Sequence, residues 1–308
     1  MKKKIITVLI LFVCFNIKAQ QDPQYTMYMF NMMSINPAYA GTIDHTDATL
    51  LGRKQWVNYP GAPQTISFNI HSPIYYDKIG LGLSVINDKL GVLNYNTINF
   101  AFSYHAKFKK SILSLGLQPS VSQLTSNLSS LKMDAPGSVP IADNAFQNIT
   151  QIDLRVGGGL FWYNNNGYIG LSTPLLAKVK VGGSSSGSVL PYSSKPHLFL
   201  TGGYVLEINP TLKLKPSTLI KYASGTPLEF DINCNVYFYD IIGVGASLRS
   251  FDSMDGIIEY KINKNFKIGY AYDYTLTNLK NYNSGSHEIM LNWQFGFKKG
   301  KILTPRYF

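Results

Sequence analysis

The sequence has few cysteines, few arginines and no long apolar run beyond its N-terminal region. Only Cys14 and Cys234 occur among 308 residues, and Cys14 lies inside an apolar N-terminal run. If that run is removed by processing, an intrachain disulfide and a cysteine metal site are both excluded. No later segment approaches the roughly 18 consecutive apolar residues of a membrane-spanning helix.

Common enzyme motifs are also missing. There is no Gly-x-Ser-x-Gly elbow, no phosphate loop and no His-Glu-x-x-His zinc pair. His287-Glu288 begins like the zinc pair, but Leu291 stands where the second histidine is required. A nucleophile and a base brought together across strands stay possible as a minor alternative. We therefore expect no enzyme, no cofactor and no metal site.

The first residues are typical of a secretory signal. Lysines 2–4 precede an apolar run over 5–15, and Ala19 suits the position before a cleavage site. The sequence predicts a signal peptide over residues 1–19, with a membrane anchor as the alternative. The formal charge of +11 minus the four lysines of this segment leaves +7 for the mature chain. Without a basic stripe this charge suits lipid headgroups or an acidic partner rather than nucleic acid.

The remaining chain alternates apolar and polar residues in many short segments. It is 45% hydrophobic, with 21 Tyr and 17 Phe. Alternation with period two is typical of strands with one apolar and one polar face. We predict fourteen strands: 46–57, 64–72, 78–87, 95–108, 111–124, 151–163, 166–172, 197–208, 211–222, 229–239, 241–249, 254–262, 266–274 and 286–297.

Connection length varies with strand parity. The connections after even-numbered segments are short, whereas the long ones, 125–150, 173–196 and 275–285, all follow odd-numbered segments. Bacterial outer-membrane barrels have short periplasmic turns and long outer loops in alternation, and an even strand number. We predict an all-β fold, a transmembrane antiparallel β-barrel over 46–308. A soluble β-sandwich is the alternative, but nothing in it would make loop length follow parity.

Residues 20–45 do not alternate and form a separate N-terminal segment. Asp22 could cap a short helix with Pro23 at its first position. Tyr25, Tyr28, Met29 and Met32 would then share one face. The segment either packs under the barrel at its periplasmic side or serves as a plug or partner-docking element. The candidate docking residues are Tyr25, Tyr28, Met29, Phe30, Asn36, Pro37 and Tyr39.

Four charged residues fall on polar strand faces and are candidate lumen charges. They are Lys213, Lys215, Lys221 and Asp231. Cross-strand ion pairs among them would close the interior, whereas unpaired charges would line an aqueous path. A solvated wall without special function is the simpler alternative.

Several sequence blocks resemble one family. The blocks are Gln24-Tyr25, Met29-Phe30-Asn31, Ser34 to Gly41, Arg53-Lys54-Gln55-Trp56, Gly61 to Thr65, Tyr272-Asp273-Tyr274 and Ser286 to Met290. Together they closely resemble the PorP/SprF family. The final Tyr307-Phe308 likewise resembles the aromatic C-terminal signal of outer-membrane barrels. A purely architectural role is the alternative for these blocks, since Asn36-Pro37 and Gly41 suit a turn into the first strand.

The resemblance implies an outer-membrane barrel of type IX secretion and gliding machinery in a Gram-negative bacterium. Such a protein would assist export or surface anchoring of a partner such as an adhesin, with outer loops contacting the partner. Residues 20–41 and the short turns would face periplasmic secretion proteins, and the wall would contact outer-membrane lipid. The alternative is an outer-membrane pore or transporter for a small solute.

Overall fold

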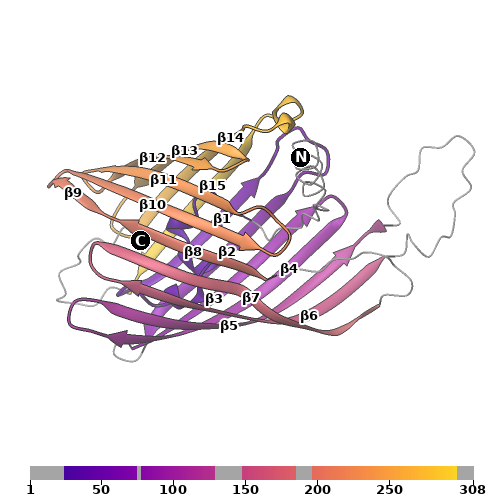
Figure 1. Ribbon diagram of the computed structural model, residues 1–308, viewed down its shortest axis with the longest axis horizontal. Coiled ribbons are helices and arrows are strands. Elements are labelled where there is room, and N and C mark those ends of the chain that lie inside the picture. Colours follow the sequence, from indigo (N-terminus) through magenta and orange to yellow (C-terminus); the bar gives the residue numbers. More distant parts are fainter. Residues whose placement is uncertain (1–23, 75–77, 129–147, 185–195, 297–308) are drawn as a thin grey trace, which may run out of the picture.

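The chain forms one closed antiparallel β-barrel in the computed structural model, which describes residues 24–74, 78–128, 148–184 and 196–296 (Figure 1). The strands are β1 (Thr46–Lys54), β2 (Gln64–Ile74), β3 (Ile79–Leu90), β4 (Leu93–Lys107), β5 (Ile112–Ser126), β6 (Ile149–Tyr163), β7 (Gly167–Ser184), β8 (His197–Tyr204), β9 (Leu206–Asn209), β10 (Leu212–Ala223), β11 (Glu229–Phe238), β12 (Ile242–Arg249), β13 (Ser253–Lys261), β14 (Phe266–Thr275) and β15 (Ser286–Phe295). β8 and β9 are separated by Val205 alone and both pair with β10, so together they make one barrel strand. Because β1 pairs with β15 and β10 with β11, the barrel closes with fourteen strands, and this prediction is confirmed.

The wall is apolar outside and polar inside. On β2, Ile66 and Phe68 are exposed, while Thr65, Ser67 and Asn69 between and beside them are buried. The same alternation recurs around the barrel, because neighbouring side chains of a strand point to opposite faces. An apolar outer face and a polar interior are what a strand wall in lipid requires.

The two ends of the barrel differ in their connections. The short-turn end carries the connections after β2, β4, β6, β9, β11 and β13, and the long-loop end carries the others. In bacterial barrels the short-turn end faces the periplasm. Not every connection at the long-loop end is long: β3 and β4 are joined there by Gly91-Val92 alone.

One predicted boundary is wrong. The segment expected at 166–172 is a strand that continues to Ser184, so the first half of the predicted loop 173–196 is strand. This second half of β7 pairs with β6, where Asp153 lies opposite Lys180 and Arg155 opposite Lys178. The run Gly182-Gly183-Ser184 favoured a loop in the sequence, yet β7 pairs with β6 as far as Ser184, opposite Thr150.

The predicted N-terminal helix is also wrong. Three single 3-10 turns stand in its place, at Tyr28–Phe30, Met32–Ser34 and Pro37–Tyr39. Backbone N–H groups here bond to side chains of the barrel wall, which removes the need for a continuous helical ladder. The expected cap at Asp22 and Pro23, the signal peptide and the final aromatic pair lie outside the described residues. No helix among the described residues is long and apolar enough to cross a membrane.

Candidate functional site

The N-terminal segment, residues 24–45, crosses the interior of the barrel. Most of its side chains are buried, with Met27 and Ala38 fully inaccessible. Its first residues bond to β14, β15, β1 and β11, whereas its last 3-10 turn packs on β4, β5, β6 and β7. Because these two strand groups lie on different sides of the barrel, the segment spans the lumen and occupies it.

A buried ion cluster holds the start of this segment. Arg53 on β1 contacts Asp273 on β14 at 2.7 Å (Nη2 to Oδ2) and Glu288 on β15 at 3.0 Å (Nη1 to Oε2). Glu288 also accepts the backbone N–H groups of Thr26 and Met27, at 2.9 and 2.8 Å. The Thr26 hydroxyl donates to Asp273 at 2.8 Å. Hydrogen bonds to ionised groups are the strong ones, so this cluster fixes the segment to three adjacent strands.

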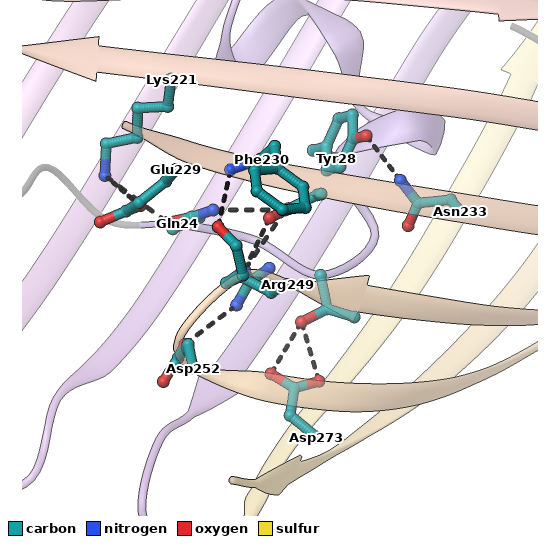
Figure 2. Close-up of polar contacts among 12 residues, drawn as sticks. Gln24, Tyr28, Lys221, Glu229, Phe230, Asn233, Arg249, Asp252 and Asp273 are labelled. Atoms are coloured by element: carbon teal, nitrogen blue, oxygen red, sulfur yellow. Dashed lines mark hydrogen bonds and ion pairs between the residues drawn. The ribbon is translucent and has the colours of Figure 1, made fainter. Parts of the chain in front are cut away.

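A second polar contact lies beside the first, on β11 and β12. Asp231 accepts a hydrogen bond from the Gln24 side chain at 3.3 Å and pairs with Arg249 at 3.2 Å. Asn233 donates to the Tyr28 hydroxyl at 2.7 Å. Figure 2 shows these side chains converging on the N-terminal segment from neighbouring strands.

The opposite wall holds the segment without charges. Three serine hydroxyls on β4, β5 and β7 donate to backbone carbonyls of the segment. The bonds run from Ser103 to Ala40, from Ser114 to Ala38 and from Ser172 to Ile35, each at 2.6 Å. Neutral hydrogen bonds of this kind contribute about 0.5–1.5 kcal/mol each.

Two strand glycines make room for the same turn. A Cβ on Gly80 would collide with the Ala40 carbonyl, and a Cβ on Gly116 would collide with the Ala38 backbone. Asn36 locks the turn, because its amide donates to the Leu160 carbonyl at 2.9 Å and its oxygen accepts the Ala38 N–H at 3.0 Å. Glycine inside these strands therefore marks close backbone approach.

The candidate docking residues all belong to this enclosed segment. Six of the seven are buried and Phe30 is half-buried; the buried ones are Tyr25, Tyr28, Met29, Asn36, Pro37 and Tyr39. Their side chains face the barrel interior, so the segment as described does not present them to the periplasm. Their role in binding a partner stays a prediction.

The four candidate lumen charges point inward. Lys213 bonds Asp240 at 2.9 Å, and Lys221 lies 3.5 Å from Glu229. The ammonium of Lys215 lies 5.5 Å from the centroid of the Phe30 ring. Asp231 pairs with Arg249 rather than with a lysine, because β12 places that arginine directly opposite it.

The residues that the sequence analysis missed are the partners in the two buried clusters. Arg53, Asp273 and Glu288 fall within the sequence blocks that carry the family resemblance, but their meeting depends on β1 closing onto β15. Arg249 belongs to no such block. Its position on the polar face of β12, opposite Asp231, was the available signal.

A cavity of about 530 Å³ lies above the segment at the long-loop end. Gln24 and Tyr25 form part of its lining, together with Trp56 and Pro63 from the β1–β2 connection and Phe251 from the β12–β13 connection. The N-terminal segment thus begins near the long-loop end and runs to β1, which starts at the short-turn end. Figure 2 shows Gln24 among Lys221, Glu229 and Arg249. Among the described residues, no group of three or more His, Cys, Asp or Glu could hold a metal ion.

Comparison with known proteins gives one family. The family model described as type IX secretion system membrane protein PorP/SprF matches residues 17–293. No curated protein matches the sequence.

Solved structures with a similar fold are distant. The outer membrane protein Omp33 of Acinetobacter baumannii is 11% identical, with a TM-score of 0.44, and the match covers 83% of this chain and 100% of that chain. A FadL homologue of Pseudomonas aeruginosa is 12% identical, with the same TM-score, over 90% of this chain and 95% of that one. The CymD monoaromatic hydrocarbon channel is 13% identical, also at 0.44, over 85% and 92%. Similarity at this level carries no argument about function.

Proposed function

The chain belongs to the PorP/SprF family of type IX secretion system membrane proteins, and from this premise we propose that it is a non-enzymatic scaffold for a partner protein. It is a component of type IX secretion in the outer membrane of a Gram-negative bacterium. The partner would be a secreted protein, such as an adhesin, that the barrel helps to export or anchors at the surface. Binding, rather than passage through the lumen, would be its mechanism.

The observation that carries this proposal is the N-terminal segment inside the lumen. The N-terminal segment crosses the interior and is bonded to strands on both sides. A barrel whose lumen is occupied in this way offers binding surfaces for a protein rather than a route for solutes. The long-loop end would then contact the partner, because recognition usually resides in loops on a rigid scaffold. The short turns would contact periplasmic secretion proteins.

The pore alternative predicts a different electrical behaviour. An open lumen gives steady ionic conductance, whereas the occupied lumen should be silent when the purified barrel is inserted into a planar bilayer. A variant that lacks residues 20–38 keeps the approach to β1 but loses the ion-cluster contacts, and it should conduct. Steady conductance from the intact protein would favour a pore and argue against the scaffold.

Partner binding is tested by isolating the intact barrel from its native membrane. We expect one or a few secreted proteins to co-purify, together with periplasmic secretion components. An excess of free barrel from the same membranes should compete with the tagged barrel for these proteins. If only outer-membrane lipid accompanies the barrel, or if competition fails, the scaffold proposal is wrong.

A further inference from the structure

Three basic side chains of the wall point away from the barrel interior. Side chains alternate between the two faces of a strand, so each residue can be assigned to a face. By this alternation every other Lys, Arg and His of the described strands faces inward, as Arg53 and Lys215 do. The exceptions are Lys54 on β1, Lys89 on β3 and His287 on β15. These three strands, with β2 between β1 and β3, form one continuous part of the wall (Figure 1).

Strand register brings the three residues into one row at the long-loop end. His287 lies opposite Lys54, and Lys54 lies opposite Gln64 on β2. Gln64 in turn lies opposite Lys89. Because neighbouring strands are about 4.8 Å apart, the backbone positions of Lys54 and Lys89 are separated by roughly 10 Å, so both ammonium groups can reach one anion between them. We call Lys54, Gln64, Lys89 and His287 the outer basic row.

No carboxylate balances the outer basic row within the part of the chain that the structure describes. Every Asp and Glu of the described strands lies on an inward face, as Asp88 and Glu288 do beside the row. Lys54 and Lys89 are exposed and form no ion pair with any described residue. The connections beside the row are described throughout and contain no Asp or Glu; they comprise 55–63, 91–92 and 276–285. The row is therefore a local excess of positive charge on the outer face.

The outer basic row lies where the hydrocarbon layer ends. β1 has 9 residues and β15 has 10, which is about the 9–11 that a tilted strand needs to cross hydrocarbon. Lys54 ends β1 and Gln64 begins β2, so the row lies at the boundary between membrane and water on the outer side. A lysine on the lipid side is strongly unfavourable at mid-membrane and nearly neutral near the interface. Lipid headgroups lie at this level.

An apolar surface begins directly beneath the row. Ile66 follows Gln64 on the outer face of β2, and Ile289 follows His287 on the outer face of β15. Both isoleucines are 58% exposed, and Leu50 on the outer face of β1 is 43% exposed. A ligand that complements both surfaces has an anionic head and apolar chains. A phosphorylated lipid has this chemistry.

We propose that the outer basic row binds the phosphate group of a lipid in the outer leaflet. The two ammonium groups donate charge-assisted hydrogen bonds to phosphate oxygens, and such bonds are stronger than neutral ones. The Tyr270 hydroxyl and Nδ1 of His287 lie 2.6 Å apart in a hydrogen bond that orients the imidazole beside Lys54. The acyl chains of the lipid lie along the apolar surface, so the site takes a lipid rather than free phosphate.

The lipid site and the buried ion cluster meet where the barrel closes. Lys54 and His287 are opposite each other on the outer face, one position away from Arg53 and Glu288, which are opposite each other inside. A phosphate bound to the row contacts β15, β1 and β3, and so bridges the two strands that close the barrel. A ligand that binds only the folded state stabilises it, so the lipid should stabilise this closure. The inference needs no partner protein and goes beyond the scaffold function.

Binding is tested with lipid A, a glycolipid that carries phosphate groups. The purified barrel in neutral detergent is titrated with lipid A, and the complexes are counted by native mass spectrometry. We expect saturable binding, and roughly tenfold weaker binding of dephosphorylated lipid A with the same acyl chains. Equal affinity for the two lipids overturns the proposal. Displacement of lipid A by inorganic phosphate, beyond that by chloride at equal ionic strength, would assign the site to the free anion and also overturns it.

The outer basic row is tested by removing its charge. Lys54→Gln with Lys89→Gln should weaken binding of lipid A by roughly tenfold and leave binding of the dephosphorylated lipid unchanged. Lys109→Gln with Lys110→Gln is the matched control, because it removes the same charge from exposed residues at the short-turn end. Equal losses in the two double variants would reduce the effect to overall charge and contradict the assigned site.

The location of the site is tested in intact cells, where lipid A is confined to the outer leaflet. A photo-crosslinking residue in place of Gln64 should crosslink to lipid A, whereas one in place of Asn165, in the β6–β7 turn, should not. Crosslinking at both positions, or at neither, overturns the proposal. This measurement retains both lysines, so it holds even if the lysine variant does not fold.

Discussion

The two sides of the barrel wall hold one N-terminal segment by different means. The short wall, β11–β15 with β1, has strands of 8–10 residues and binds the segment through buried ions. The tall wall, β4–β7, has strands of 15–18 residues and binds it through serine hydroxyls and glycine contacts. Both kinds of contact hold the segment in one position. Removing one partner of a buried ion pair, however, should cost more folding stability than removing one neutral hydrogen bond.

The two walls fix different properties of the segment, its starting position and its depth in the barrel. Arg53 binds only where two carboxylates and the Thr26 hydroxyl converge, so the short wall fixes where the segment starts. The absent side chain of Gly116 lets the Ala38 backbone approach β5 closely, so the tall wall fixes the distance between this turn and the strands. Variants on the two walls should therefore differ in size of effect and in which part of the segment moves.

The largest effect is expected from Arg53→Met. Asp273 and Glu288 would remain buried without their cation, and loss of one partner of a buried pair costs about 3–5 kcal/mol. Thermal unfolding of the purified barrel in detergent, followed by the heat-dependent shift on gels, measures the loss. Lys264→Met at an exposed turn is the control and should be neutral. Adding Glu288→Gln to Arg53→Met should recover part of the stability, and a further loss would contradict the cluster.

A smaller but clear loss is expected from Gly116→Val on the tall wall. Added atoms would meet the Ala38 backbone, and overpacking of this kind costs roughly 1–3 kcal/mol. Gly256→Val is the matched control, because a Cβ there meets nothing within 4 Å. The same unfolding measurement applies. Equal stability of the two variants would show that the turn does not seat against β5.

Ser114→Ala should cost less, about 0.5–1.5 kcal/mol, because one neutral hydrogen bond to the Ala38 carbonyl is lost. Amide exchange over residues 36–40 should quicken while that over 26–28 stays unchanged. If both stretches respond alike, the two walls do not act separately.

The smallest effect is expected from Lys213→Gln. Its partner Asp240 is 30% exposed at the short-turn end, and ion pairs open to water contribute about 0–1 kcal/mol. Unfolding temperatures of wild type and variant should agree closely at high salt. A loss of stability as large as that of Arg53→Met would mean that burial does not determine how much these ion pairs contribute to stability.

The strands could be predicted because lipid outside and polar groups inside impose a period of two along every segment. β7 was predicted too short because the Gly182-Gly183-Ser184 run favoured a loop, although Lys178-Val179-Lys180-Val181 keeps the alternation. The helix expected over Tyr25 to Met32 failed for another reason. Spacing alone indicated it, but Glu288, more than 250 residues away, takes the N–H groups that would have extended it.

The candidate site was predictable in part. Asp231 and the lysines were expected on inward faces, and the structure places them there. Their partners depend on register between strands, as Asp231 opposite Arg249 illustrates. Arg53 and Glu288 depend on closure of the barrel, which brings the first strand to the last. This second relation has no local signature in the sequence.

Thiol labelling of residue 24 in intact cells tests the central claim most directly. In a Cys234→Ala background, Gln24→Cys would place a thiol in the cavity at the long-loop end. Asn58→Cys and Asn165→Cys are controls at the exposed long-loop and short-turn ends. A membrane-impermeant maleimide should label residues 24 and 58 in intact cells, and residue 165 only after the outer membrane is permeabilised. Labelling of residue 24 only after permeabilisation would contradict a segment that runs through the barrel to its outer end.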